Sequence, residues 1–202
     1  GQFGKLALTA DGHWTYTPDN RADALAAGTQ QSETFTVTSA DGTTHQDALT
    51  LTGTNDGPVI ADTGASGTVA EDASTDTATG ALSVTDPDTG DTATVTVQTD
   101  VAGTYGSFSV DAAGAWTYAL DNAKAETQAL TAGESHTETC TGTATDRAGE
   151  TTTHDVTVTA TGTNDGPVVG QTVDLGSIAE DSGPLVIHAS DLLAGVTDID
   201  SA

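Results

Sequence analysis

The sequence predicts an all-β protein made of tandem immunoglobulin-like antiparallel β-sandwiches. Apolar and polar residues alternate over short segments, which is typical of strands with one buried face, and clusters of Gly, Asp and Asn separate these segments. The heptapeptide Gly-Thr-Asn-Asp-Gly-Pro-Val occurs at residues 53–59 and again at residues 162–168, 109 positions later. A repeat at domain length indicates consecutive sandwiches joined by one kind of linker.

A second repeated stretch supports this module length. Trp-Thr-Tyr at residues 14–16, followed by Asp-Asn, returns at residues 116–118, 102 positions later. Because this offset is smaller than the 109 positions between the heptapeptides, the second copy has extra residues between its Trp-Thr-Tyr stretch and its heptapeptide. We expect these residues in loops, where insertions are tolerated. We therefore expect three modules. They are the closing part of a first repeat at residues 1–56, a complete repeat at residues 57–165 and the opening part of a third at residues 166–202.

Strands of the complete module can be placed by their alternation. Residues 92–97, 107–110, 116–120 and 156–160 each put apolar side chains on one face and Thr, Ser or other residues on the opposite face. Helix is expected only as short turns, at residues 123–130 and, with a weaker signal, at residues 190–194.

The charge balance restricts the possible partners. Four Lys and Arg residues stand against 30 Asp and Glu residues, for a formal net charge of −26. Such a chain cannot offer the basic surface that nucleic acid requires, and direct insertion into an anionic membrane is disfavoured. Cations are its natural counter-ions. A single Cys forms no disulfide framework, so packing, with or without metal, must hold an extracellular repeat together. The sequence shows no signal peptide or membrane-spanning run, and we expect it to be a fragment of a longer protein.

Several residues invite a functional interpretation, but packing or solvation accounts for them. Trp14 and Trp116 occupy equivalent alternating positions and are predicted to lie in sandwich cores. Cys140 aligns with Phe35 and is predicted to be a buried, inert thiol in a less well packed second core. The two equivalent histidines at positions 45 and 154 are predicted at solvated loop or edge positions. No catalytic motif occurs, so no enzymatic activity is predicted.

Acidic residues concentrate where the modules join. Asn55 and Asp56 lie in the linker, Asp86 and Asp88 follow a predicted strand, and Asp146 ends another. Loops at the same pole of a sandwich converge, so these carboxylates would crowd together and repel unless a cation lay among them. Six to eight oxygen ligands around a hard cation describe calcium. Ordinary turn formation by Asn-Asp-Gly-Pro and Asp-Pro-Asp-Thr-Gly is the alternative explanation.

Three stretches resemble a known family. The repeated heptapeptide, residues 106–118 and the Ala-Glu-Asp sequence at residues 70–72 are similar to the VCBS repeats of very large bacterial surface adhesins, relatives of bacterial cadherin-like domains. Residues 179–200 resemble a neighbouring cadherin-like subtype. The resemblance implies cadherin-like sandwiches in an RTX-type adhesin that is secreted to the cell surface and extended by calcium at its domain junctions.

The resemblance also implies which residues bind the ions. The cadherin linker pattern Asp-x-Asn-Asp-x-x-Pro corresponds to residues 54–58 and 163–167, although its first Asp is missing. The implied ligands are Asn55, Asp56, Asp86, Asp88 and Asp146 for the joint at Asp56; Glu71, Asp121, Asn164 and Asp165 for the joint at Asp165; and Asp198 with Asp200, the Asp-x-Asp pair of the third module.

The function predicted from these observations is that of a non-enzymatic extender and adhesion segment whose joints are stiffened by structural Ca²⁺. Its partners are neighbouring repeats of the same chain, together with a polysaccharide, host or biofilm surface. One alternative is a module that binds exopolysaccharide, which requires exposed aromatic side chains. The other is an acidic spacer that binds no metal and keeps flexible joints.

Overall fold

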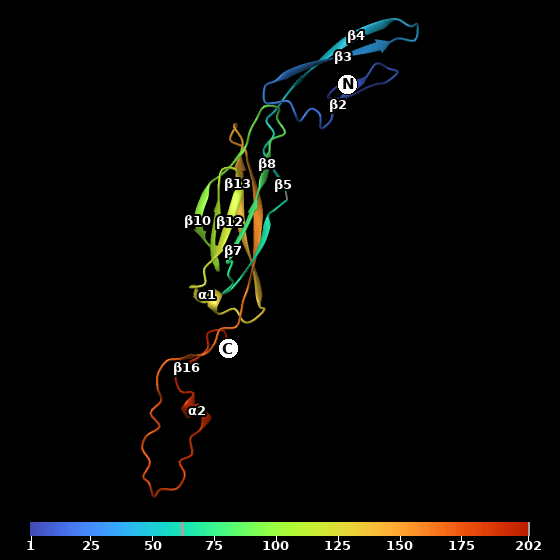
Figure 1. Cartoon of the computed structure of the whole chain (residues 1–202). Coiled ribbons are helices and arrows are strands. Elements are labelled where there is room, and N and C mark those ends of the chain that lie inside the picture. Colours follow the sequence, from blue (N-terminus) through green and yellow to red (C-terminus); the bar gives the residue numbers. More distant parts are fainter. Residues whose placement is uncertain (62, 202) are drawn as a thin grey trace.

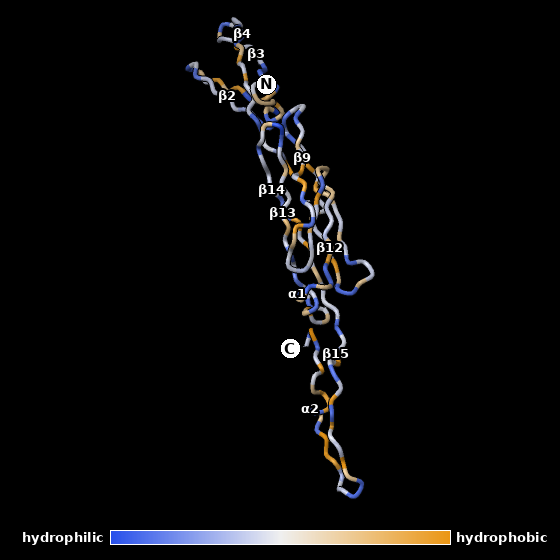
Figure 2. Tube along the Cα trace, turned by 90° about the vertical axis from the view of Figure 1, so that its left-hand side faces the viewer, coloured by the Kyte–Doolittle hydropathy of each residue, from blue (hydrophilic) through white to orange (hydrophobic). Residues whose placement is uncertain are grey.

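The computed structural model describes residues 1–61 and 63–201 and shows an elongated molecule in which segments follow one another end to end (Figures 1 and 2). Strands dominate, as the sequence predicts, and the all-β fold class is confirmed. The central part is a β-sandwich, with smaller β-structures at either end of the molecule. Among the described residues, neither helix is long and apolar enough to cross a membrane.

Two four-stranded sheets form the central sandwich. The first has the strand order β10-β11-β12-β7 and the second β6-β14-β13-β9, and a short β5-β8 pair lies beside them. All pairs are antiparallel except β6 with β14. The strands are β5 (Val59–Ala61), β6 (Ser66–Ala70), β7 (Thr77–Ala81), β8 (Ser83–Thr85), β9 (Thr94–Val95), β10 (Gln98–Ala102), β11 (Gly106–Val110), β12 (Ala115–Leu120), β13 (Ser135–Thr145) and β14 (Thr151–Thr161).

Alternation along these strands builds the core. In β12, Trp116, Tyr118 and Leu120 all point inward, because successive side chains of a strand face opposite sides of its sheet. Side chains of β11, β13 and β14 meet them from both sheets. The prediction for residues 92–97 was only partly correct: β9 is two residues long, and Val97 is 59% exposed.

In the second core, the space beside Gly142 is occupied by the side chain of Leu82. A Cβ atom on Gly142 would lie 2.5 Å from Leu82 Cδ1, so the Leu82 side chain uses the space that a larger residue would need. Leu82 is 1% exposed. At Gly142, the residue Leu82 between β7 and β8 therefore takes up the volume, and a comparison of aligned positions cannot reveal this; the looser packing expected at Cys140 stays a prediction.

Residues 1–56 form two separate hairpins, β1-β2 and β3-β4, and no further strand of the described chain pairs with them. Trp14 is 61% exposed, so its predicted place in a core was wrong. In the central sandwich, β7 pairs with β12 beside Trp116. Among the described residues, no such strand pairs with β2 beside Trp14. The strands are β1 (Gly4–Leu8), β2 (Trp14–Pro18), β3 (Gln30–Thr38) and β4 (Thr44–Thr52).

The two predicted helical turns are present as single turns, α1 (Ala125–Gln128) and α2 (Ala189–Leu192). The helix α2 belongs to residues 166–202. In this segment β15 (Val168–Val169) pairs with β16 (Val196–Thr197), and residues 170–188 contain neither strand nor helix. The division into one complete and two partial repeats stays a prediction.

Cys140 is partly buried in β13, and its pKa is raised to about 11 by burial and by the charge of Glu138. At pH 8 only about one thiol in a thousand is then the reactive thiolate. We expect the rate of alkylation by iodoacetamide, followed by mass spectrometry, to rise about tenfold per pH unit from pH 7 to 10. The urea-unfolded chain should instead level off near pH 8.5, the approximate pKa of free Cys. A native rate that levels off at the same pH would contradict this assignment.

Candidate metal centre

Acidic side chains gather at two places along the molecule, one at each end of the central sandwich. The first joint comprises residues 23–27, 53–59, 86–91 and 146–150, and the second joint comprises residues 71–72, 128, 162–168 and 197–201. At each place a heptapeptide linker passes between neighbouring segments (Figure 1).

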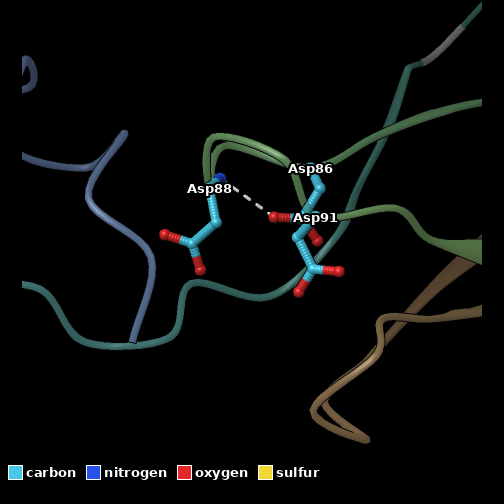
Figure 3. A group of neighbouring side chains, drawn as sticks. All are labelled: Asp86, Asp88 and Asp91. Atoms are coloured by element: carbon cyan, nitrogen blue, oxygen red, sulfur yellow. Dashed lines mark hydrogen bonds between the residues drawn. The ribbon is translucent and has the colours of Figure 1, made fainter. Parts of the chain in front are cut away.

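A turn directly after β8 carries three of the acids of the first joint. Gly90 has a φ of 88°, a conformation that suits glycine, and the Asp91 N–H donates to the Asp88 carbonyl oxygen over 3.1 Å. The Asp88 N–H donates to Asp86 Oδ1 over 2.9 Å. As Figure 3 shows, the three side chains project from one loop, and one carboxylate oxygen from each lies within 4.8 Å of the others.

The linker is bound to this loop and to its neighbour. The Asp56 N–H donates to Asp88 Oδ2 over 3.0 Å, and Asp88 is 3% exposed. The Asn55 amide donates to Asp146 Oδ2 over 2.8 Å and to Glu150 Oε2 over 3.0 Å. These bonds place linker and loop oxygens in one region.

The preceding segment reaches the same region. The Thr89 N–H donates to the Ala24 carbonyl oxygen over 3.1 Å, which joins the acidic loop to the segment before the linker. Next to Ala24, the Asp23 carboxylate is close enough to act electrostatically on Asp56. The first joint therefore collects acids from both sides of the linker.

The electrostatics of the first joint are unfavourable as they stand. Burial raises the pKa of the Asp56 carboxyl, and the negative charges of Asp88, Asp23, Glu150 and Asp86 raise it further. Among the described residues, Asp86 Oδ2 and Asp88 Oδ1 are buried and have no hydrogen-bond partner. Buried carboxylate oxygens without partners are costly, and a cation would satisfy them.

Asp146 differs from the other acids of the first joint. Its carboxylate accepts the Asn55 amide on one oxygen and the backbone N–H groups of Gly149 and Glu150, at 2.6 and 2.7 Å, on the other. The hydrogen bond from Asn55 is the main reason that its pKa is lowered. Asp146 thus organises the loop and orients Asn55.

The second joint repeats the central contact of the first. The Asp165 N–H donates to Asp200 Oδ2 over 3.1 Å, as Asp56 does to Asp88. Within the described chain, Asp165 Oδ2, Asp198 Oδ1 and Asp200 Oδ1 are buried without a hydrogen-bond partner. Burial, then the charges of Asp72, Asp200 and Asp198, raise the pKa of Asp165. At this joint the unpartnered oxygens come from the linker residue Asp165 as well as from Asp198 and Asp200, whereas at the first joint both come from the loop that contains Asp86 and Asp88.

Glu71, which directly follows β6, is the carboxylate that the central sandwich contributes to the second joint. It is 1% exposed, and its oxygens accept the Gln128 amide over 2.9 Å and the Thr163 N–H over 3.1 Å. Burial raises the pKa of Glu71, the Thr163 hydrogen bond opposes this, and the charge of Asp165 adds to it. A carboxylate held this far from water is well placed to share a cation with the linker.

The structure brings together most of the acids proposed from the sequence. The linker and loop residues meet at each joint, with Asn55, Asp56, Asp86, Asp88 and Asp146 at the first and Glu71, Asp165, Asp198 and Asp200 at the second. Asn164 is exposed, and its amide donates to the Asp165 carbonyl oxygen over 2.6 Å.

Asp121 is placed differently. It is exposed, and its Oδ1 accepts the Ala123 N–H over 2.9 Å in the turn that precedes α1. This is the local turn role of an Asp, and the equivalent Asp19 accepts the Arg21 N–H in the same way over 3.1 Å. Its role as a ligand stays a prediction.

Four further acids belong to the joints and were not proposed from the sequence: Asp23, Asp72, Asp91 and Glu150. The signal for Asp91 was present, because it follows Asp86 and Asp88 in one turn-forming stretch. Asp23 and Glu150 lie far from the linker in sequence, and only the folded chain shows that they face Asp56.

Comparisons with known proteins point to one kind of domain. The model of the bacterial cadherin-like domain matches residues 55–162, more than half of the chain. No curated protein matches the sequence. Solved structures with a similar arrangement include protocadherin gamma B7 extracellular cadherin domains 1–4 (20% identity, TM-score 0.45, covering 90% of this chain and 45% of that one).

Two further solved structures are similar at lower identity. The first is Drosophila N-cadherin EC1–4, with 15% identity and a TM-score of 0.41, and the match covers 83% of this chain and 42% of that one. The second is the human desmocollin-1 ectodomain, with 13% identity and a TM-score of 0.35, and the match covers 82% of this chain and 33% of that one. The chain spans less than half the length of each of these three structures.

Proposed function

The chain belongs to the bacterial cadherin-like domain family, and from this we propose that it is an extracellular adhesion segment in which calcium at the two joints stiffens consecutive modules. Its similarity to VCBS repeats supports a place within a large RTX-type adhesin of a bacterial cell surface, acting in attachment to a polysaccharide, host or biofilm surface. No catalytic family is indicated by the match.

The single observation that supports calcium is the set of buried, unpartnered carboxylate oxygens at each joint. Within the described residues they come from Asp86 and Asp88 at the first joint, and from Asp165, Asp198 and Asp200 at the second. The donors are carboxylates and an amide, without His or Cys, which is the chemistry of a hard cation. Calcium fits better than magnesium, because it accepts six to eight oxygens in irregular geometry and needs fewer retained waters.

The candidate ligands at the first joint lie on both sides of the linker. They are Asp23 of the preceding segment, Asn55 and Asp56 of the linker, and Asp86, Asp88 and Asp91 of the following loop. A divalent cation shared among them would replace mutual repulsion with attraction and hold the two segments in one orientation. The resulting function is mechanical: the consecutive modules form a rigid, extended array.

Binding of calcium should stabilise the fold by mass action. At a free concentration of about 100 times the dissociation constant, each site adds roughly 2.7 kcal/mol to the free energy of unfolding. Extracellular modules bind in the range of about 0.1 to 1 mM. For a domain of about 100 residues, this corresponds to a rise of roughly 10 to 20 °C in the unfolding temperature per occupied site.

The test is a thermal melt together with X-ray scattering, in EDTA and in calcium well above the expected dissociation constant. We expect the unfolding temperature and the maximum dimension both to increase in calcium. Sodium chloride at matched ionic strength is the control for simple charge screening. If both quantities are the same in EDTA and in calcium, the chain is a metal-free acidic spacer and the proposal fails.

A further inference from the structure

The turn before the long hairpin is built in the same way in residues 1–56 and in the central sandwich. In the first copy, the N–H of the buried Leu25 donates to the Ala22 carbonyl oxygen over 2.9 Å. In the second copy, the N–H of the buried Leu130 donates to the Thr127 carbonyl oxygen over 3.0 Å. Residues that lie 105 positions apart in the two turns are therefore structural counterparts.

Both turns are joined to the linker by the same contacts. The Gly28 N–H donates to the Gly53 carbonyl oxygen over 3.0 Å, and the Gly133 N–H donates to the Gly162 carbonyl oxygen over 3.0 Å. A Cβ atom on the linker glycine would lie 2.1 Å from the carbonyl oxygen of the buried leucine in the first copy and 2.5 Å in the second. The backbone alone thus fixes each turn against its linker.

This correspondence makes Gln128 the counterpart of Asp23, two residues before the buried leucine. Asp23 lines a hollow of about 360 Å³ together with Asp56. Gln128 lines a hollow of about 400 Å³ together with Asp165. The same backbone position therefore lies beside the linker Asp at both joints, with a carboxylate at the first joint and a neutral amide at the second.

Gln128 is firmly placed at the second joint. The neighbouring Thr127 is buried, and its hydroxyl donates to the Tyr105 carbonyl oxygen over 3.2 Å. The Gln128 Nε2 group donates to Oε1 of the buried Glu71 over 2.9 Å. A neutral donor satisfies this oxygen but leaves the charge of the carboxylate uncompensated. Gln128 thus orients Glu71 without adding charge to the joint.

Asp23 acts on the first joint through its charge. It is exposed, and after burial its charge is among those that raise the pKa of Asp56. At the second joint, burial and then the charges of Asp72 and of the loop after the linker raise the pKa of Asp165, and position 128 contributes none. This position therefore adds one negative charge to the first joint and no charge to the second.

We propose that this position, Asp23 at the first joint and Gln128 at the second, sets the calcium affinity of its joint. The inference rests on the proposed function, because it concerns the same calcium sites. Oxygen sites for calcium are tuned by the number of charged ligands and by the rigidity of the site. Asp23 acts through charge, whereas Gln128 acts through rigidity by holding Glu71 in place.

Gln128→Glu is the isosteric test at the second joint. In EDTA we expect a lower unfolding temperature, because Glu71 loses a hydrogen-bond donor and gains a like charge beside it. In calcium the dissociation constant of the second joint should decrease roughly tenfold, since the variant adds a carboxylate charge to the site. A residue with only a structural role would weaken both stability and binding, so the combination identifies a residue that acts on the ion.

Calorimetry assigns the change to one joint when the other is silenced. Asp86→Asn together with Asp88→Asn removes two loop carboxylates of the first joint, so the remaining binding heat reports the second. In this background, Gln128→Glu should bind calcium about tenfold more tightly than its parent. Circular dichroism in calcium confirms that the central sandwich is folded in both.

Asp23→Asn is the reciprocal test at the first joint. It is made in a background with Asp198→Asn and Asp200→Asn, which removes the corresponding loop carboxylates of the second joint. Calcium should bind roughly tenfold more weakly than to the parent. The unfolding temperature in EDTA should stay the same or rise, because a like charge that acts on Asp56 is removed. Asp23 is exposed, so its replacement creates no cavity.

Gln98→Glu is the matched control for the added charge. Gln98 is a partly buried amide of the central sandwich, outside both joints, and its Nε2 group donates to the Thr141 carbonyl oxygen over 2.9 Å. The variant loses a similar hydrogen bond and gains the same charge, and its calcium affinity should equal that of the parent. If it tightens binding as much as Gln128→Glu does, net charge sets the affinity and the proposal is wrong.

Failure of this inference can be told apart from failure of the proposed function. If the wild type binds calcium but either Gln128→Glu or Asp23→Asn leaves the affinity of its joint unchanged, the inference is overturned and the proposed function stands. If the wild type gives no binding heat and has one unfolding temperature in EDTA and in calcium, both are overturned.

Discussion

Replacing both Asp86 and Asp88 by Asn is expected to abolish the calcium response of the first joint. In EDTA the variant should be as stable as the wild type or more stable, because two crowded charges beside Asp56 are removed. An Asn oxygen at position 88 can still accept the Asp56 N–H. In saturating calcium the variant should lack the gain of roughly 2.7 kcal/mol per site that the wild type receives.

The measurement is a series of thermal melts across a calcium titration, with calorimetric binding on the same samples. Asp111→Asn is the matched control, since Asp111 accepts the Ala113 and Ala115 N–H groups in a hairpin turn on the central sandwich. This control should keep the wild-type calcium response. Equal calcium gains in wild type and double variant would show that these two carboxylates do not bind the ion.

Trp116→Ala is expected to cost about 3 to 5 kcal/mol of the free energy of unfolding, the range for truncating a buried large aromatic side chain. The ring is 1% exposed, and its Nε1–H donates to the Gly64 carbonyl oxygen over 2.9 Å. A Cβ atom on Gly80 would lie 2.6 Å from Trp116 Cζ2, so the neighbouring strand is shaped around the indole. Alanine would leave a cavity and an unpaired carbonyl group.

The repeated sequence supplies the matched comparison. Trp14→Ala removes the same residue type from the same Trp-Thr-Tyr context, but Trp14 is 61% exposed. It should change stability by about 0.5 kcal/mol or less in the monomer. Urea unfolding followed by circular dichroism measures the loss of stability in both variants. The protein concentration is kept where sedimentation shows monomers. Equal losses would contradict the difference in burial.

Much of the fold could be predicted because strands have a period of two. The alternation in residues 107–110, 116–120 and 156–160 predicts which side chains face inward, and the structure buries Phe108, Val110, Trp116, Tyr118 and Leu120 as expected. Length was harder to predict. Alternation continues to Val97, yet β9 ends at Val95, because pairing with β13 extends over only two residues.

The candidate site could be predicted where its residues are local in sequence. Asp86 and Asp88 follow a strand, and the linker Asp recurs in both heptapeptides, so their place at the joints follows from topology alone. Asp23 and Glu150 could not be found in this way, since their proximity to Asp56 depends on two loops from different segments. Asp91 was missed although it is local, because the family pattern contains only the Asp-x-Asp pair.

By itself the sequence determined the all-β class, the inward faces of the main strands and the acidic character of the two joints. These are properties of period, composition and repeat, which need no knowledge of distant contacts. Only the tertiary structure decided that Trp116 is buried while the equivalent Trp14 is exposed, and that buried carboxylate oxygens at the joints lack partners among the described residues. Burial and hydrogen-bond satisfaction depend on which segments the fold brings into contact, and identical local sequences can meet different neighbours.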